Sequence, residues 1–259
     1  MSASAERRVT VVVPAYNEAG RLPALLETLE VRGAELFAAS GLELAELIVV
    51  DDGSADETAG LLRDRPASGF RFRAISFPEN RGKGAAVRAG MLAAGGPLAL
   101  LADADMATPF EEVTKLAAAL GGGADIAIGS RGLAESEIVV HQPAYRELAG
   151  KGFNLGLRVL TRLPYRDTQC GFKLFRLDRA LQLFELQRID GFAYDAEVLV
   201  LARRHGLRVA EVPVRWRDDP ATTVKLFSAS SRMALDLLRI AWLARRPARP
   251  GRGRAAATT

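Results

Sequence analysis

The sequence predicts an α/β fold, in which an open and mostly parallel sheet carries helices on both faces. Residues 8–15 (RVTVVVPA) and 47–50 (LIVV) are continuous apolar runs rich in β-branched residues, which is typical of strands covered on both sides. Stretches with helical spacing alternate with such runs through residue 128, as in consecutive βαβ units. Polar residues follow several of the runs, where sheets of this class bind ligands.

Apolar runs and stretches with helical spacing follow one another along the chain. The apolar runs predict strands over residues 8–15, 47–50, 70–77, 98–101 and 126–128, and helices are expected between them over 22–29, up to residue 62, over 84–94 and over 109–120. After residue 131 the pattern changes. There we expect a mobile loop over 132–142, a helix over 143–162, a polar segment over 167–172, a short apolar run over 173–177, helices over 178–186 and 195–205, and a strand over 208–214.

The domain organisation follows from the same pattern. We expect a flexible N-terminus over residues 1–7, a single α/β domain over 8–226, an amphipathic helix over 227–246 and a disordered basic tail over 247–259. The lone cysteine, Cys170, excludes an internal disulfide framework and fits a reducing cytosol. No secretory signal and no apolar stretch of about 20 residues is evident, so a cytoplasmic protein is expected, meeting any membrane at its inner face.

Two aspartates end the apolar run of residues 98–101. Asp103 and Asp105 are separated by one alanine, so in an extended chain both carboxylates point to the same side. Paired carboxylates suit Mg²⁺ or Mn²⁺, which then complete their shells with water and phosphate oxygens. The alternative for such a short motif is a solvated turn at the end of a strand.

Polar residues are also expected at the ends of two neighbouring strands, beside this pair. Tyr16 and Glu18 follow the first strand, and Asp51 and Asp52 follow the second. A carboxylate can accept the imide N–H of uracil and a tyrosine can stack on a base, so Pro14, Tyr16, Glu18 and Asp51 would form a nucleoside cradle. In the alternative interpretation, Asp51 and Asp52 only cap the next helix.

A glycine-rich turn precedes the third expected helix. In Asn80-Arg81-Gly82-Lys83-Gly84 the glycines allow close approach of the backbone, and Lys83 adds positive charge at a helix N-terminus. This pattern is typical of a phosphate cradle, although it lacks the P-loop spacing and could be purely structural.

Taken together, the motifs resemble a known family. They are VVVPAYNE (11–18), IVVDDGSADET (48–58), NRGKGAAVRAGM (80–91), ADADMAT (102–108), IAIGSR (126–131), DTQCGFKLF (167–175) and YDAEVLVLA (194–202). This combination resembles family 2 glycosyltransferases over about residues 8–217, and within them the dolichyl-phosphate β-glucosyltransferase and polyprenyl-phosphate sugar transferase branch.

The resemblance implies an inverting, metal-dependent hexosyltransferase of GT-A fold. The donor would be a nucleotide sugar, UDP-glucose or alternatively GDP-mannose, and the acceptor a polyprenyl or dolichyl phosphate, although another acceptor remains open. Carried over to this chain, it places the nucleoside on Pro14, Tyr16, Glu18 and Asp51, with Asp52 also in the nucleotide-sugar site, and the Mg²⁺ or Mn²⁺ on Asp103 and Asp105. The acceptor phosphate would meet Arg131 and Arg146, and the diphosphate Lys83 or Lys225. Asp167 and Gln169 would contact sugar hydroxyls, and Asp195 would be a base or sugar-binding acid.

Two positions depart from the family pattern. Ala107 stands where some members place a glutamine as a further metal ligand, so the metal would depend more on water. The segment 221–225 (ATTVK) replaces a loop that often contains Gly-Ser-Lys, which puts the geometry around Lys225 in doubt. Asp195 also has a simpler interpretation, as an acidic residue favoured at a helix N-terminus.

The last expected helix is amphipathic. Helical spacing places Arg232, Asp236, Arg239 and Arg246 on one side and Leu235, Leu238, Ala241 and Trp242 on another. Such a helix either lies in a membrane interface or packs on the domain. The expected partners are therefore a peripheral membrane contact or a membrane partner protein. A nucleic-acid partner is not expected, because the basic tail lacks interleaved aromatic residues, and a non-catalytic sensor of nucleotide sugars would leave the basic acceptor set idle.

Overall fold

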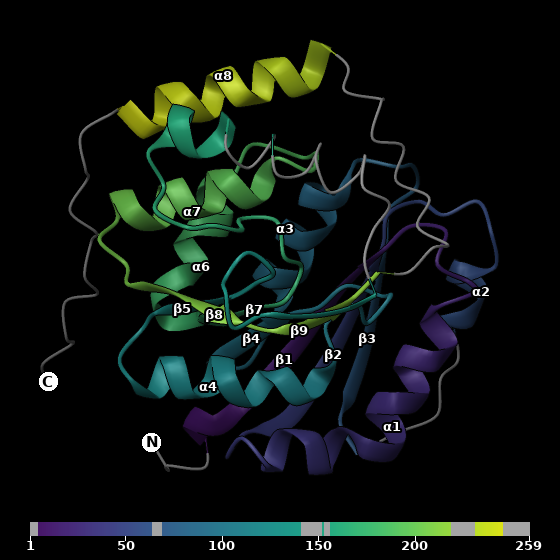
Figure 1. Ribbon diagram of the computed structural model, residues 1–259. Coiled ribbons are helices and arrows are strands. Elements are labelled where there is room, and N and C mark those ends of the chain that lie inside the picture. The colour runs from purple at the N-terminus through teal and green to yellow at the C-terminus, as the bar shows by residue number, and fades with distance from the viewer. Residues whose placement is uncertain (1–4, 64–68, 141–151, 153–155, 219–230, 246–259) are drawn as a thin grey trace, which may run out of the picture.

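The computed structural model describes residues 5–63, 69–140, 152, 156–218 and 231–245 (Figure 1). A seven-stranded sheet forms its centre, in the order β3-β2-β1-β4-β7-β5-β8. The strands are β1 (Arg8–Ala15), β2 (Glu43–Asp51), β3 (Arg71–Ser76), β4 (Leu98–Leu101), β5 (Ile126–Ser130), β7 (Lys173–Arg176) and β8 (Val209–Pro213). All neighbouring pairs are parallel except those of β7, which runs antiparallel to β4 and β5.

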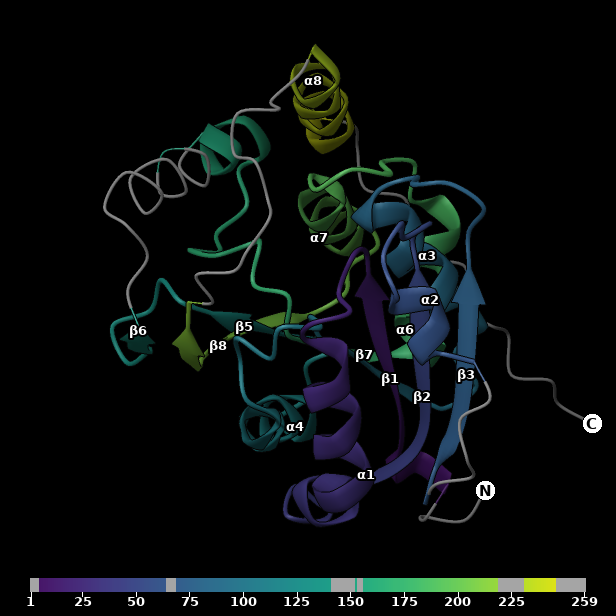
Figure 2. The same ribbon diagram turned by 90° about the vertical axis from the view of Figure 1, so that its right-hand side faces the viewer.

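Helices cover both faces of this sheet, as Figures 1 and 2 show. One face carries α1 (Leu22–Ala38), the short η2 (Phe110–Glu112) and α4 (Val113–Gly121); the other carries α3 (Lys83–Ala93), α6 (Leu177–Leu186) and α7 (Tyr194–Arg204). The remaining elements are η1 (Ala5–Arg7), α2 (Thr58–Leu61) and α8 (Ser231–Arg245), which packs on the outer side of α7. The α/β prediction is therefore confirmed.

The continuous apolar run of β1 reflects this two-sided cover. Val9, Val11 and Val13 belong to the core cluster under α1 and α4, whereas Val12 belongs to the cluster under α3 and α7. Helix α3 lies close to the strand, because a Cβ on Gly90 would come within 2.4 Å of the Val12 side chain. Alternate residues of one strand thus support opposite layers, which an amphipathic strand could not do.

The structure corrects one expectation outside the main sheet. Residues 132–142 were predicted to be a mobile loop, but Glu137–Val140 form β6, which pairs in parallel with β9 (Arg215–Arg217). The prediction failed because pairing with a distant segment, which spacing cannot reveal, satisfies the backbone of this short strand. Of the helix expected over 143–162, residues 156–161 are helical, and most of the rest lies outside the described residues.

Several other boundaries shift without changing the type of element. Helix α1 continues to Ala38, β2 starts at Glu43, and α2 is a single turn. Among the described residues, no helix combines the length and the apolar character that crossing a bilayer requires.

Candidate active site

The polar tips of β1, β2 and β4 meet at one edge of the sheet. The register pairs Ala15 with Asp51 and Val12 with Leu101, so the three adjacent strands end at nearly the same level. Asp51 and Asp52 therefore lie beside the start of the 16–18 segment, and Asp103 and Asp105 follow β4 at the same edge. This juxtaposition, predicted from strand polarity, is confirmed.

A set of hydrogen bonds fixes the first two tips to one another. Asn17 adopts a positive φ of 55°, and its backbone N–H donates to Ser54 Oγ at 2.9 Å. The side chain of Asn17 accepts the N–H of Ala55, and the N–H of Glu18 donates to Thr58 Oγ1 at 2.8 Å. Sequence reasoning missed these linking residues, although asparagine is a common residue in this left-handed conformation. They hold the backbone around Tyr16 and Glu18, and leave the Tyr16 ring 44% exposed.

Asp52 orders the glycine-rich turn before α3. Its carboxylate accepts the backbone N–H groups of Arg81 and Gly82, each at 2.8 Å, and the side-chain amide of Asn80 at 2.9 Å. Gly82 has φ of 108°, and a Cβ there would lie 2.4 Å from the carbonyl oxygen of Asp190. Asp52, expected to bind the nucleotide sugar, is thus buried and bound to the turn that positions Lys83.

Lys83 reaches from the first turn of α3 to the aspartate pair. Its ammonium lies 2.7 Å from Asp103 Oδ1. Burial opposes ionisation of Asp103, but the charge and hydrogen bond of Lys83, together with the charges of Lys173 and Arg131, keep the pKa of this carboxyl below its ordinary value. Gly171 packs directly on the other side, since a Cβ there would come within 2.0 Å of Asp103 Oδ2.

The carboxylates of Asp105 and Glu18 lie near that of Asp103, and we call the three together the acidic edge. The pKa values of Asp105 and Glu18 are both raised. Burial, followed by the charge of Asp103, raises the pKa of Asp105. Burial also raises the pKa of Glu18 to about 7, with further contributions from Asp105 and Asp103, even though Arg21 lies 2.6 Å from its carboxylate. Carboxylates that disfavour one another's charge are what a divalent cation would stabilise, so Asp103 and Asp105 fit such an ion, and the charge of nearby Glu18 adds to the negative field. The described part of the chain contains no group of three or more His, Cys, Asp or Glu arranged to hold a metal, so water or substrate would have to complete the shell.

Arg131 and Asp167 form a bidentate pair. The guanidinium donates through Nε to Asp167 Oδ2 at 2.6 Å and through Nη2 to Oδ1 at 3.0 Å, and the backbone N–H of Arg131 also donates to Oδ2. Burial disfavours both charges, but each partner stabilises the other, so the pKa of Asp167 is lowered and that of Arg131 is raised. Arg131 also lies over the Trp216 ring, 5.3 Å from its centroid, and Trp216 lines one cleft together with Asp103 and Asp105.

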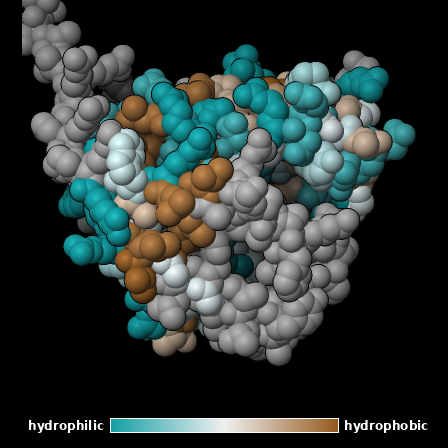
Figure 3. All heavy atoms as spheres, turned by 90° about the horizontal axis from the view of Figure 1, so that it is seen from above, coloured by the Kyte–Doolittle hydropathy of each residue, from teal (hydrophilic) through white to brown (hydrophobic). Residues whose placement is uncertain are grey.

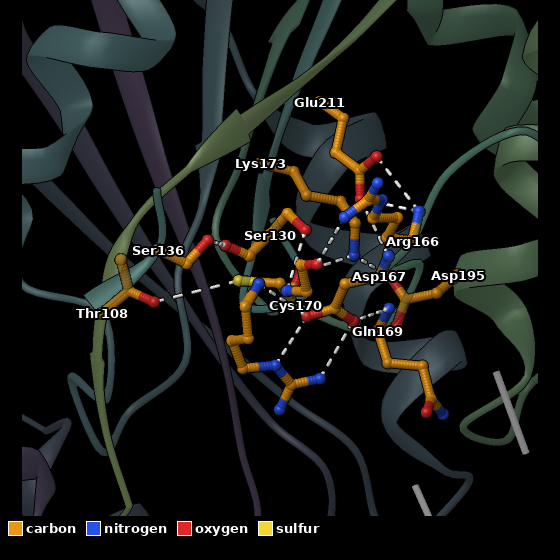
Figure 4. Close-up of polar contacts among 12 residues, drawn as sticks. Thr108, Ser130, Ser136, Arg166, Asp167, Gln169, Cys170, Lys173, Asp195 and Glu211 are labelled. Atoms are coloured by element: carbon orange, nitrogen blue, oxygen red, sulfur yellow. Dashed lines mark hydrogen bonds and ion pairs between the residues drawn. The ribbon is translucent and has the colours of Figure 1, made fainter. Parts of the chain in front are cut away.

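The side chains of Glu211, which is partly buried, and of Lys173, which is buried, hold the segment around Asp167 (Figure 4). Glu211 accepts the backbone N–H groups of Arg166 and Asp167, each at 2.8 Å. Lys173, only 2% exposed, donates to the carbonyl oxygen of Cys170 at 2.6 Å and to the carboxylate of Asp195. The buried role of Lys173 was not predicted from the sequence. A lysine beside the apolar residues of a short strand was the signal that its charge is buried and paired.

Asp195 is therefore an interior group in this structure. It lies in the first turn of α7, 6% exposed and paired with Lys173, and burial raises its pKa against that pairing. Cys170 is buried as well, and burial raises the pKa of its thiol, in agreement with a packing role. Two ion pairs thus stand next to one another in the site, Lys83 with Asp103 and Lys173 with Asp195.

The remaining expected residues occupy different positions. Pro14 is buried in β1, opposite Val50 of β2. The backbone of Gln169 donates to Asp167 Oδ1, and its side chain extends away from the cluster in Figure 4. Arg146 and Lys225 lie outside the described residues. A separate cavity of about 560 Å³ shares Met106, Ala107 and Trp216 with the aspartate cleft.

Comparisons with known proteins agree with this geometry. The model of the glycosyl transferase family 2 matches residues 10–182. A dolichyl-phosphate beta-glucosyltransferase of Trichomonas vaginalis is 37% identical over 241 residues, which cover 90% of this chain and 72% of that protein. The dolichyl-phosphate beta-glucosyltransferase of Homo sapiens is 35% identical over 247 residues, covering 91% of this chain and 75% of that protein.

Solved structures show the same fold at lower identity. The glucosyl-3-phosphoglycerate synthase of Mycobacterium tuberculosis, crystallised with Mn²⁺, UDP-glucose and phosphoglyceric acid, has a TM-score of 0.62 and 22% identity, with 91% of this chain and 80% of that chain covered. The mannosyl-3-phosphoglycerate synthase of Rubrobacter xylanophilus has a TM-score of 0.61 and 18% identity, with coverage of 90% and 72%. The fold is thus of the GT-A type, and the chain belongs to glycosyl transferase family 2 and is a glycosyltransferase.

Proposed function

We propose that this enzyme transfers glucose from UDP-glucose to dolichyl phosphate or a related polyprenyl phosphate, with inversion at the anomeric carbon. The observation that carries the proposal is the match to named dolichyl-phosphate beta-glucosyltransferases at 34–38% identity over about nine-tenths of the chain. The acidic edge beside Lys83 supports it, because it offers both the carboxylates and the cation that a sugar diphosphate needs.

The nucleoside would bind at the ends of β1 and β2. The Tyr16 ring is exposed enough to stack on a base, and its backbone is fixed through Asn17. Asp51 is 2% exposed and already accepts the N–H of Ser54 through Oδ1, so a uracil imide would meet a preorganised carboxylate. Asp52 contributes indirectly, through the turn that carries Lys83.

Asp103 and Asp105 would hold a Mg²⁺ or Mn²⁺ ion. Bound there, the ion would neutralise the charge that develops on the departing diphosphate. The raised pKa values of Asp105 and Glu18 support this assignment, because a nearby cation would favour their ionised forms. Lys83, at 2.7 Å from Asp103, would supply a second positive charge to the same leaving group.

The acceptor needs positioning and no general base. A phosphate monoester has a second pKa near ~6, so at neutral pH it is already an oxyanion. Asp167 holds the Arg131 guanidinium through Nε and Nη2, and Nη1 takes no part in that pair. Arg131 would therefore meet the acceptor phosphate in a fixed orientation, with Arg146 as a further basic contact and Lys225 on the diphosphate. Asp167 and Gln169 would contact sugar hydroxyls beside the ion pair of Asp167 with Arg131. Asp195 would act through its ion pair with Lys173, which in turn holds the backbone at Cys170.

A transfer assay with defined donors and acceptors tests the proposal. Purified full-length enzyme is mixed with radiolabelled UDP-glucose or GDP-mannose, dolichyl or undecaprenyl phosphate, and either Mn²⁺ or EDTA. Label should enter the lipid fraction only from UDP-glucose and only with metal, and Asp105→Asn should abolish transfer. Transfer from GDP-mannose alone would refute the donor, and equal turnover in EDTA would refute the metal. A protein that binds these donors without turnover on either lipid would refute the acceptor.

A further inference from the structure

Helix α8 buries one apolar face and leaves a second apolar face exposed. Ile240 is fully buried and Ala241 is 6% exposed against the cluster around α7. Leu235, Leu238 and Trp242 are 56%, 66% and 57% exposed. They recur at i, i+3 and i+7, so they share one side of the helix. Packing on the domain therefore buries only part of the apolar surface that the sequence places on this helix.

A second element extends the exposed apolar surface. In the helical segment 156–161, Val159 is 70% and Leu160 is 39% exposed. Arg203 of α7 binds both elements, because it donates to the carbonyl oxygen of Thr161 at 2.7 Å and to that of Ala244 at 3.3 Å. The ends of the two segments are thus held close to one another by one side chain of α7. We call Leu235, Leu238, Trp242, Val159 and Leu160 together the outer apolar face.

The exposed charged residues of these two segments are all arginines. Arg158, Arg162, Arg239 and Arg245 are exposed beside the outer apolar face. The only acidic residue in the described segments 156–163 and 235–245 is Asp236, which is 6% exposed and lies 3.6 Å from Arg239. Figure 3, which looks onto this side of the molecule, shows hydrophobic side chains gathered next to hydrophilic ones.

We propose that the outer apolar face docks on the surface of an anionic lipid bilayer, with α8 lying in the plane of the interface. Apolar side chains with a tryptophan would enter the region between headgroups and acyl chains, and the arginines would meet lipid phosphates. A second copy of the chain fits less well, because a symmetric contact would bring arginine against arginine. The inference rests on exposure and charge alone, and does not depend on the proposed substrates.

Flotation of the full-length enzyme with vesicles tests this inference. One set of vesicles contains phosphatidylcholine only, and the other contains phosphatidylcholine and phosphatidylglycerol at a ratio of 7:3. The wild type should float with the anionic vesicles, weakly with the neutral ones, and less as salt rises. The double variant Leu238→Ser/Trp242→Ser should lose at least tenfold in binding. Val31→Ser is the matched control, because Val31 is 76% exposed on α1 and should leave binding unchanged.

A second pair of variants tests whether the arginines beside the outer apolar face contribute to binding. Arg239→Glu should reduce binding to anionic vesicles severalfold, whereas Arg32→Glu on α1 should not, although the Arg32 side chain is also exposed, at 50% against 69% for Arg239. Circular dichroism and an unchanged Tm would show that each variant is folded. Equal flotation of wild type and double variant would overturn the proposal. So would a dimer in analytical ultracentrifugation that the double variant abolishes, since a second copy would then cover the face.

Discussion

Replacing Gly171 by alanine is the sharpest test of how the aspartate pair is positioned. The backbone of Gly171 is not among the glycines with positive φ, so alanine meets no conformational penalty there. The added Cβ would instead lie 2.0 Å from Asp103 Oδ2 and 2.3 Å from its Cγ. The carboxylate would have to move, although Lys83 holds its other oxygen at 2.7 Å.

The expected effect is on metal and donor binding more than on folding. Forcing a methyl group into a packed site costs about 1–3 kcal/mol, which corresponds to a loss of about 5- to 150-fold in affinity when the cost falls on the bound state. Asp103 lies at the edge of the sheet with its side chain 30% exposed, so its displacement disturbs little of the core. We expect a higher Mn²⁺ concentration for half-maximal transfer and a nearly unchanged Tm.

A Mn²⁺ titration of glucosyl transfer, combined with thermal denaturation without ligand, measures both quantities. The matched control is Gly121→Ala at the end of α4, where an added Cβ meets nothing within 4 Å. If Gly171→Ala shows the wild-type dependence on Mn²⁺, the contact with Asp103 does not position a metal ligand. If Gly121→Ala loses as much activity, the effect is not specific to the site.

Two other predictions concern the stability of the charged groups. Lys173→Met should lower stability by about 3–5 kcal/mol, because it leaves the buried carboxylate of Asp195 without its cation, and adding Asp195→Asn should restore part of the loss. Urea unfolding measures both, and a wild-type midpoint for the single variant would contradict the assignment. In metal-free buffer, stability should fall as pH rises from about 4.5 to about 7, because folded Glu18 keeps a proton that the unfolded chain has lost. Glu18→Gln should remove this part of the slope in a series of Tm values, and an unchanged slope would assign it to other groups.

Much of the site was predictable because strand polarity is visible in the sequence. A buried run followed by Asp51-Asp52, and another followed by Asp103 and Asp105, must end at the same edge if the strands are parallel and adjacent. The family resemblance then added chemistry that periodicity alone cannot supply, and the match over residues 10–182 confirms the family.

Other features depended on contacts that no spacing reveals. The antiparallel β7 enters between β4 and β5 from a position more than forty residues later in the chain, and brings Lys173 beneath the site. Strand β6 exists only because β9 pairs with it. In the same way, Asp167 proved to be the partner of Arg131, and Asp52 the residue that orders the turn before Lys83.

Local periodicity and polarity were enough to predict the α/β class, the sheet edge that holds the acidic residues, and the amphipathic character of the last helix. Which charges neutralise one another, and which apolar face of that helix stays exposed, became visible in the folded chain. Lys83 meets Asp103, Arg131 meets Asp167, and α8 buries Ile240 while it exposes Leu238. The physical reason is that charge pairing and burial depend on distances between residues far apart in the chain, which packing fixes and spacing does not.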